Sequence, residues 1–351
     1  MSEMNASVFE NVRNLVGFIV GGKAFAGSWD VAVEIANASL TTPALAHRLR
    51  TGRTNEPAPA DVLAYLTEVY ERNSQRNGRL LAQLDEAVGC LNSVGIVPLL
   101  LKGTVSLLTP GYDRGARLLT DLDLMVEPSE LPQSLKALRS IGYEGHSLGA
   151  ARDQNGPDAY LPVVLSRPSD VGSIDIQCRF KGTTGSMDVF SIEDHKIRSG
   201  IGSAEAFLPS PTFQLAYLLL HDLFQDGDHW RGLIDLRHVL DMAHLSRGEI
   251  RWALVRELFS SPTSARAVES QFRMVDALVG SRSSPTFADD RLARLQYNRK
   301  IIQLNHPGTR PLFTLLTVVL GWPPFLVPQG NSRTAFSEFC RLFRPITIGK
   351  V

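Results

Sequence analysis

Residues 99–126 read LLLKGTVSLLTPGYDRGARLLTDLDLMV, and this stretch decides the fold. A short apolar strand (99–101) leads into a Lys-Gly turn, and a second strand follows that carries Asp121 and Asp123. Side chains alternate between the two faces of a strand, so both carboxylates lie on one face. Two like charges this close are tolerated only when one is protonated or a cation lies between them. The spacing therefore predicts a metal site, and carboxylate oxygens together with substrate phosphates favour Mg2+.

The same stretch supplies candidate phosphate ligands. Gly103 lacks a Cβ, so backbone N–H groups there can approach a triphosphate closely. Lys102 and Arg117 could neutralise the phosphate charge, Arg117 with a planar fork that fits phosphate oxygens. With Thr104, these residues form the expected nucleotide-binding set. The alternative is that Arg117 pairs with a nearby acid such as Asp113 and that Lys102 merely ends a strand.

Lys102-Gly103, then Arg117 followed four and six residues later by Asp121 and Asp123, resembles the uncharacterised nucleotidyltransferase family of the polymerase-β superfamily. The resemblance spans roughly residues 60–245. It implies an α+β fold with a polymerase-β-type nucleotidyltransferase core, a short mixed sheet backed by helices, flanked by N- and C-terminal helical segments. It also implies transfer of a nucleoside monophosphate from an NTP to a hydroxyl or other acceptor on a small molecule or protein. Pyrophosphate would leave, and Mg2+ or alternatively Mn2+ would be held by the aspartates.

Residues 173–178 alternate in polarity and place Asp175 opposite a buried face. By resemblance, Asp175 is the third catalytic and metal-binding carboxylate, on a strand next to Asp121 and Asp123, and acts as base or electrostatic activator for the acceptor hydroxyl. The alternative is an ordinary solvent-facing acid. The chain departs from the family at Gln177-Cys178, where His-Trp is common, and at Thr104, where the superfamily commonly has Gly or Ser.

The chain divides into an N-terminal helical segment (1–95), an α/β core (96–205) and a C-terminal helical segment (206–351). Apolar residues recur with helical spacing over 61–91, and a polar interruption at 73–79 is compatible with one helix or two. The loop 109–115 fits either a substrate-facing flap or a plain extension. The patterns predict further helices over 8–20, 28–38, 43–51, 128–141 (with Ser129 as its N-cap) and from 210 onward.

Two histidines, His221 and His229, suggest zinc. However, the sequence has neither an HExxH motif nor a cysteine partner, and ordinary structural histidines are the favoured interpretation. Further along, Arg237 and Asp241 have the i, i+4 spacing of a helical ion pair. The cysteines, Cys90, Cys178 and Cys340, are odd in number and widely spaced, which favours reduced thiols.

Charge and hydropathy limit the partners. The 36 basic and 36 acidic residues cancel, so no overall field favours long nucleic acid, and a small-molecule or protein acceptor is expected. No signal peptide is recognisable, and the expected location is the cytoplasm. Two other functions stay open, namely a catalytically inactive nucleotide-binding protein and a protein that docks to a partner or peripherally to a membrane. The apolar and basic segment 311–351 would carry the docking.

Overall fold

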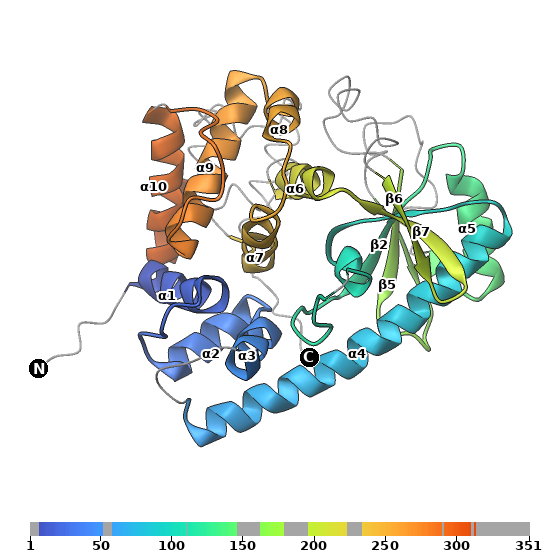
Figure 1. The fold of residues 1–351 in the computed structure, drawn as a ribbon, viewed down its shortest axis with the longest axis horizontal. Helices are drawn as coiled ribbons and strands as arrows, with labels where there is room; N and C mark the ends of the chain where they lie inside the picture. The colour runs from blue at the N-terminus through green and yellow to red at the C-terminus, as the bar shows by residue number, and fades with distance from the viewer. Residues whose placement is uncertain are drawn as a thin grey trace, which may run out of the picture.

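The computed structural model describes residues 7–51, 58–109, 111–145, 162–178, 196–222, 234–289, 291–309 and 312–313. Figure 1 shows a sheet with its covering helices at one end of the molecule and a group of helices at the other. His229, Cys340 and nearly all of the candidate docking segment 311–351 lie outside the described residues. Within the described part, no helix is long and apolar enough to cross a membrane.

The core is a mixed seven-stranded sheet in the order β3-β4-β5-β2-β1-β7-β6, which confirms the expected α+β class. The central strands β2 and β5 run parallel, whereas β2 and β1 are antiparallel. The strands are β1 (Leu99–Leu100), β2 (Asp121–Met125), β3 (Glu144–Gly145), β4 (Val163–Ser166), β5 (Ser173–Gln177), β6 (Lys196–Ile201) and β7 (Ala204–Pro209). The sheet continues through β7 to Pro209, past residue 205, where the sequence pattern had placed the end of the core.

Two helices pack on the sheet, α4 (Ala60–Ser93) and α5 (Leu131–Ser140). The polar interruption at 73–79 does not break α4, which is one continuous helix of 34 residues. Its inward stripe follows a 3–4 residue spacing, which is expected for a helix that keeps one face on a core. In α5, by contrast, the residue before the helix is Glu130 and not the expected cap Ser129. The buried stripe of α4 includes Leu66, Asn73, Asn77, Leu80, Leu84, Ala87 and Leu91.

The remaining helices form two further apolar clusters. One contains parts of α1, α2, α3 and the start of α4, and the other contains α6 to α9 together with Phe9, Val12 and Val16 of α1. The chain's first described helix therefore packs among helices from its C-terminal half, as Figure 1 shows for α1 and α9. These helices are α1 (Val8–Gly21), α2 (Trp29–Ala38), α3 (Thr42–Thr51), α6 (Pro211–Leu220), α7 (Leu236–Leu245), α8 (Trp252–Leu258), α9 (Pro262–Val279) and α10 (Arg291–Asn305).

The predicted start of the helix at residue 210 is confirmed. Ser210 accepts a hydrogen bond from the backbone N–H of Phe213, and Pro211 occupies the first helical position, where its missing N–H costs nothing. The helix α6 leads out of the sheet directly after β7, so its C-terminal end lies between the sheet and the helices α7 to α9 (Figure 1).

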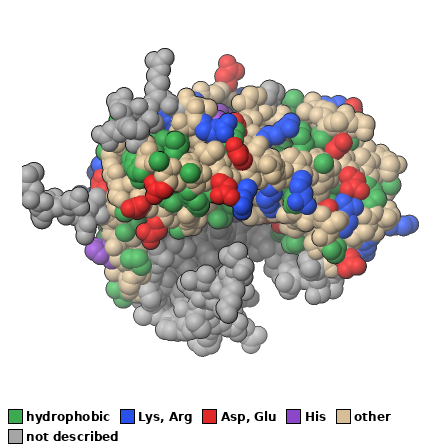
Figure 2. Space-filling view, turned by 90° about the horizontal axis from the view of Figure 1, so that it is seen from below, with side chains coloured by type: hydrophobic (Ala, Val, Ile, Leu, Met, Phe, Trp, Pro, Cys, Tyr) green, Lys and Arg blue, Asp and Glu red, His purple; other side chains and the backbone are tan. Residues whose placement is uncertain are grey.

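The surface seen from below carries acidic and basic side chains interspersed with one another (Figure 2). No broad field of one sign is visible on the described atoms of that face, in agreement with the zero net charge of the chain. This distribution gives long nucleic acid no continuous basic track on this side of the molecule.

Candidate active site

Three carboxylates meet where β2 and β5 run side by side. The register places Asp121 opposite Ser173 and Asp123 opposite Asp175, so strand alternation directs all three acids to the same face of the sheet. One oxygen from each of Asp121, Asp123 and Asp175 lies within 4.8 Å of the others. On the opposite face, Ile174 and Ile176 are fully buried. The three predicted metal ligands are therefore together in space.

Nearby positive charge balances the three carboxylates only in part, since Lys102 pairs with Asp123 while Arg76 and Arg237 act on Asp121 from a longer range. Burial raises the pKa of Asp123, and Lys102 opposes that rise. Burial, and after it the charges of Asp123 and Asp121, raises the pKa of Asp175 to about 7. Lys102 supplies one ammonium group for the three acids, with Nζ 2.8 Å from Asp123 Oδ1. A divalent cation among oxygen donors would relieve this repulsion, so the donor set fits a hard metal ion such as Mg2+.

The Lys-Gly turn is joined to the Asp-x-Asp strand by backbone and side-chain bonds. The Leu101 N–H donates to Asp123 O at 3.0 Å, and the Asp123 N–H donates to Thr104 Oγ1 at 2.8 Å. Gly103 leaves room for its neighbours, because a Cβ there would lie 2.4 Å from Leu119 Cδ2 and 2.9 Å from Arg117 Nε and would force these side chains to move. Lys102 has a positive φ of 47°, an uncommon conformation for a residue with a side chain. The turn thus holds the Lys102 ammonium group at the carboxylates.

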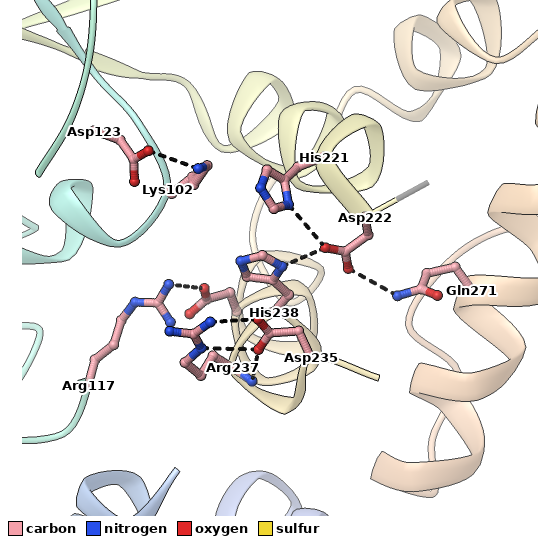
Figure 3. A network of polar contacts seen from close by, with 10 residues as sticks. Lys102, Arg117, Asp123, His221, Asp222, Asp235, Arg237, His238 and Gln271 are labelled. Carbon is pink, nitrogen blue, oxygen red and sulfur yellow. Dashed lines mark hydrogen bonds and ion pairs between the residues drawn. The ribbon is translucent and has the colours of Figure 1, made fainter. Parts of the chain in front are cut away.

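Arg117 does not pair with Asp113. Its Nη2 lies 3.0 Å from Oδ2 of Asp241 on α7, and both side chains are largely buried. Asp113 instead accepts from the Tyr70 hydroxyl. The expected pair between Arg237 and Asp241 is also corrected, because Arg237 binds Asp235 at 2.8 Å. Figure 3 shows Arg117 reaching toward α7, with Lys102 beside Asp123 above it in this view.

The polar residues of α4 hold the loop that leads into β2. Asn73 donates to the carbonyls of Gly115 and Arg117 at 3.0 and 2.9 Å, and Asn77 donates to Arg117 O at 2.8 Å. Arg76 donates to Leu119 O and, at 2.7 Å, to Val171 O, so it connects the entries of β2 and β5. The loop is therefore fastened along its length to a helix.

The polar residues at 73–79, in the middle of α4, predict no function from the sequence alone. The signal was the placement of Asn73 and Asn77 in the same stripe as Leu66 and Leu80, where apolar residues are expected. A buried amide needs partners, and loop carbonyls are suitable ones. Asp241, the partner of Arg117, was considered only in relation to Arg237.

Comparisons with known proteins place this geometry in context. A crystal structure of an antigenic nucleotidyltransferase-like protein from Paracoccidioides brasiliensis is 17% identical, with a TM-score of 0.37, over 60% of this chain and 94% of that one. The nucleotidyltransferase toxin MenT4 of Mycobacterium tuberculosis is 13% identical, with a TM-score of 0.35, over 78% of this chain and 98% of its own. No curated protein sequence matches the chain.

The family comparison covers most of the sequence. The family described as "Uncharacterised nucleotidyltransferase" matches residues 26–280, which include the Lys-Gly turn, all three aspartates and the helices α6 to α9. The resemblance carried by residues 99–126 is therefore supported over a much longer stretch. The chain belongs to the uncharacterised nucleotidyltransferase family, and the enzymatic activity of that class is nucleotidyl transfer.

Proposed function

We propose that the protein is a metal-dependent nucleotidyltransferase that moves a nucleoside monophosphate from an NTP to an acceptor on a small molecule or protein. The observation that carries the proposal is the meeting of Asp121, Asp123 and Asp175 on two adjacent parallel strands. Mg2+, or Mn2+ in its place, would be held by these three residues. The ion would stabilise the negative charge of the attacking and leaving oxygens during displacement at the α-phosphate.

The protein's own groups have separate roles in this reaction. Asp175 takes the proton from the acceptor hydroxyl, because it lies beside Asp123 on the neighbouring strand and is the third carboxylate of the site. Lys102 neutralises Asp123 and lies where it can also contact a phosphate oxygen. Thr104 positions the backbone of Asp123, and Gly103 permits the tight turn.

We assign Arg117 to binding the triphosphate, although in the free protein its guanidinium group is paired with Asp241. The guanidinium group must leave Asp241, or share it, when phosphate binds. The backbone of Arg117 is held by Asn73 and Asn77, so only the side chain needs to move. The pair thus keeps a buried arginine neutralised before nucleotide arrives.

The second candidate is a protein that binds nucleotide without catalysis. The pairing of Lys102 with Asp123 and of Arg117 with Asp241 favours it, because both candidate phosphate ligands already have acidic partners. Gln177, which donates to the Tyr217 hydroxyl at 2.8 Å, stands where the family often has histidine. Only a catalytic measurement separates this candidate from the enzyme.

The test combines binding and turnover on the full chain. We expect an NTP with Mg2+ to raise the melting temperature more than either alone, since a ligand that binds only the folded state stabilises it by mass action. Pyrophosphate release from a mixture of the four NTPs, with a cell extract of small molecules and proteins added to supply the acceptor, should depend on Mg2+ and be lost in Asp121→Asn. Glu144→Gln, on the exposed edge of the sheet, is the matched control. Nucleotide binding without pyrophosphate release would favour the inactive candidate, and no binding would reject both.

A further inference from the structure

A second polar cluster lies at the end of α6, next to the carboxylate site. His221 and Asp222 follow α6 directly in a π-type turn, and His238 belongs to α7. Asp222 and His238 are buried, and the His221 side chain is 21% exposed. Such widened turns are rare and occur often at functional sites. Here the turn allows consecutive residues to face the same point, as Figure 3 shows for His221 and Asp222.

Both imidazole rings present the same nitrogen to one carboxylate oxygen. Nδ1 of His238 is 2.5 Å from Asp222 Oδ1, and Nδ1 of His221 is 3.6 Å from that oxygen. The rings are nearly perpendicular, with centroids 5.2 Å apart. One potential ligand atom from each of the three residues lies within 4.8 Å of the others. Two imidazole nitrogens and one carboxylate oxygen form a known donor set for zinc.

We propose that His221, Asp222 and His238 bind a transition-metal ion of the zinc type, at a site separate from the carboxylate site. Nitrogen donors favour Zn2+ over Mg2+, which prefers oxygen donors alone. Ligands at about 2.0–2.2 Å in tetrahedral geometry lie roughly 3.3–3.5 Å apart. The 3.6 Å separation already agrees with this value. The 2.5 Å contact has to open by about 0.8 Å to reach it.

The surrounding residues hold the carboxylate ligand in place. Asp222 Oδ2 accepts a hydrogen bond from Gln271 Nε2 of α9 at 3.2 Å, and Gln271 Oε1 accepts one from Lys300 Nζ of α10 at 2.6 Å. Hydrogen bonds of this kind orient metal ligands and tune their basicity. Residues from α9 and α10 thus fix the free oxygen of Asp222 while the other oxygen faces the imidazoles.

A hydrogen bond between His238 and Asp222 alone would account for fewer of the observed contacts than a bound metal ion. A proton shared by His238 and Asp222 satisfies both of those groups, whereas Nδ1 of His221, at 3.6 Å from the same oxygen, makes a longer ionic contact that also lowers the pKa of Asp222. That nitrogen is buried and has no hydrogen-bond partner in the described part of the chain. A metal ion would satisfy all three side chains and leave one coordination position for water or a substrate atom.

The test uses Zn2+ alone and a background in which the carboxylate site is disabled. The full chain with Asp121→Asn and Asp175→Asn is treated with a chelator and titrated with Zn2+ in excess Mg2+. We expect about one Zn2+ per chain, a raised melting temperature, and the visible absorption of a low-symmetry site when Co2+ replaces Zn2+. Because no nucleotide is used, this result is independent of the proposed transferase activity.

His221→Gln in the same background is the decisive variant. It leaves the His238–Asp222 contact in place, so the metal-free melting temperature should not change, whereas the affinity for Zn2+ should fall at least tenfold. His244→Gln, on the exposed side of α7, is the matched control and should bind as the background does. Failure to take up Zn2+, or equal uptake with and without His221, would overturn the proposal.

Discussion

The carboxylate site on the sheet and the histidine cluster on the helices are close neighbours built in different ways. On the sheet, Asp121, Asp123 and Asp175 are positioned by strand alternation and by the parallel register of β2 and β5. On the helices, His221, Asp222 and His238 meet because the end of α6 packs against α7. The first site follows from a repeating backbone geometry, whereas the second depends on how two helices dock.

The two sites also differ in charge. Three carboxylates share one ammonium group on the sheet, and repulsion raises the pKa of Asp175. In the helical cluster a single carboxylate faces two imidazoles and an amide. An added cation or a proton would therefore relieve the charge repulsion in the carboxylate site, whereas His221, Asp222 and His238 together are close to neutral without one.

The largest expected effect is on turnover. Asp121→Asn should reduce nucleotidyl transfer at least about a thousandfold, because aligning the reactants at a metal supplies many kilocalories of barrier lowering. Its melting temperature should stay near that of the wild type, since Asp121 is only partly buried. Pyrophosphate release and circular dichroism on one sample measure both properties. Turnover at the wild-type rate would remove Asp121 from the catalytic set.

Asp123→Asn should lose turnover and stability together. Asp123 is buried and is the ion-pair partner of Lys102, so the variant leaves a buried ammonium group without its counter-charge. Breaking a buried pair in this way typically costs about 3–5 kcal/mol. Urea unfolding of the two variants side by side tests the difference, and equal stabilities would show that Lys102 does not depend on Asp123.

The next effect concerns Arg117 and Asp241. Arg117→Ala should destabilise the free protein by about 3–5 kcal/mol, because it leaves Asp241 buried and unpaired. The affinity for an Mg-NTP should also fall roughly tenfold to a hundredfold, the usual value of one charge-assisted phosphate contact.

Asp241→Asn separates the two roles of Arg117. If the arginine must leave Asp241 to bind phosphate, this variant should bind Mg-NTP more tightly than the wild type while folding less stably. Isothermal titration at matched temperature measures the affinity. If both Asp241→Asn and Arg117→Ala bind Mg-NTP with wild-type affinity, Arg117 does not bind phosphate and has only a structural role.

A smaller effect is expected along α4. Asn73→Ala and Asn77→Ala should each cost about 1–3 kcal/mol, because each strips buried loop carbonyls of a donor. The exposed neighbour Gln75→Ala is the control and should change stability by less than about 0.5 kcal/mol. Urea midpoints measure all three. Equal urea midpoints for all three variants would mean that the hydrogen bonds from Asn73 and Asn77 to the loop do not stabilise the fold.

A pH dependence is also expected from Lys300, which donates to Gln271 beside the histidine cluster. Burial lowers the pKa of Lys300 to about 8, from an ordinary value near 10.5. The unfolded chain therefore holds this proton more tightly, and stability should rise between about pH 8 and 10.5 by at most about 1.4 kcal/mol per pH unit. Lys300→Met should remove this slope, which the difference between urea midpoints of the two proteins would show. Parallel curves would contradict the lowered pKa.

The sequence predicted well which side chains of β2 and β5 face each side of the sheet. The alternation in 121–126 and in 173–178 correctly placed apolar residues inward and acids on one face, because strand period is independent of the rest of the fold. The helical segments over 8–20, 28–38 and 43–51 were also close to the observed helices. In each case a local pattern was sufficient.

Contacts between distant elements were not predictable in the same way. Nothing in the sequence pairs Arg117 with Asp241, 124 positions away, or brings α1 onto α9. A charged side chain has several possible partners, and only the packed fold selects one. The prediction for Ser129 failed for a related reason, since several polar residues preceded α5 and each was an acceptable cap.

The positive φ of Lys102 implies a compromise between folding and function. A side chain in the left-handed region costs roughly 1–2 kcal/mol relative to glycine, so glycine would have the lower backbone conformational energy at this turn. The chain places a lysine there instead, followed at once by the glycine that sterics require. Lys102→Gly would relieve this strain but would leave Asp123 buried without its counter-charge, so the lysine marks a position at which backbone strain is accepted to keep a charge beside Asp123.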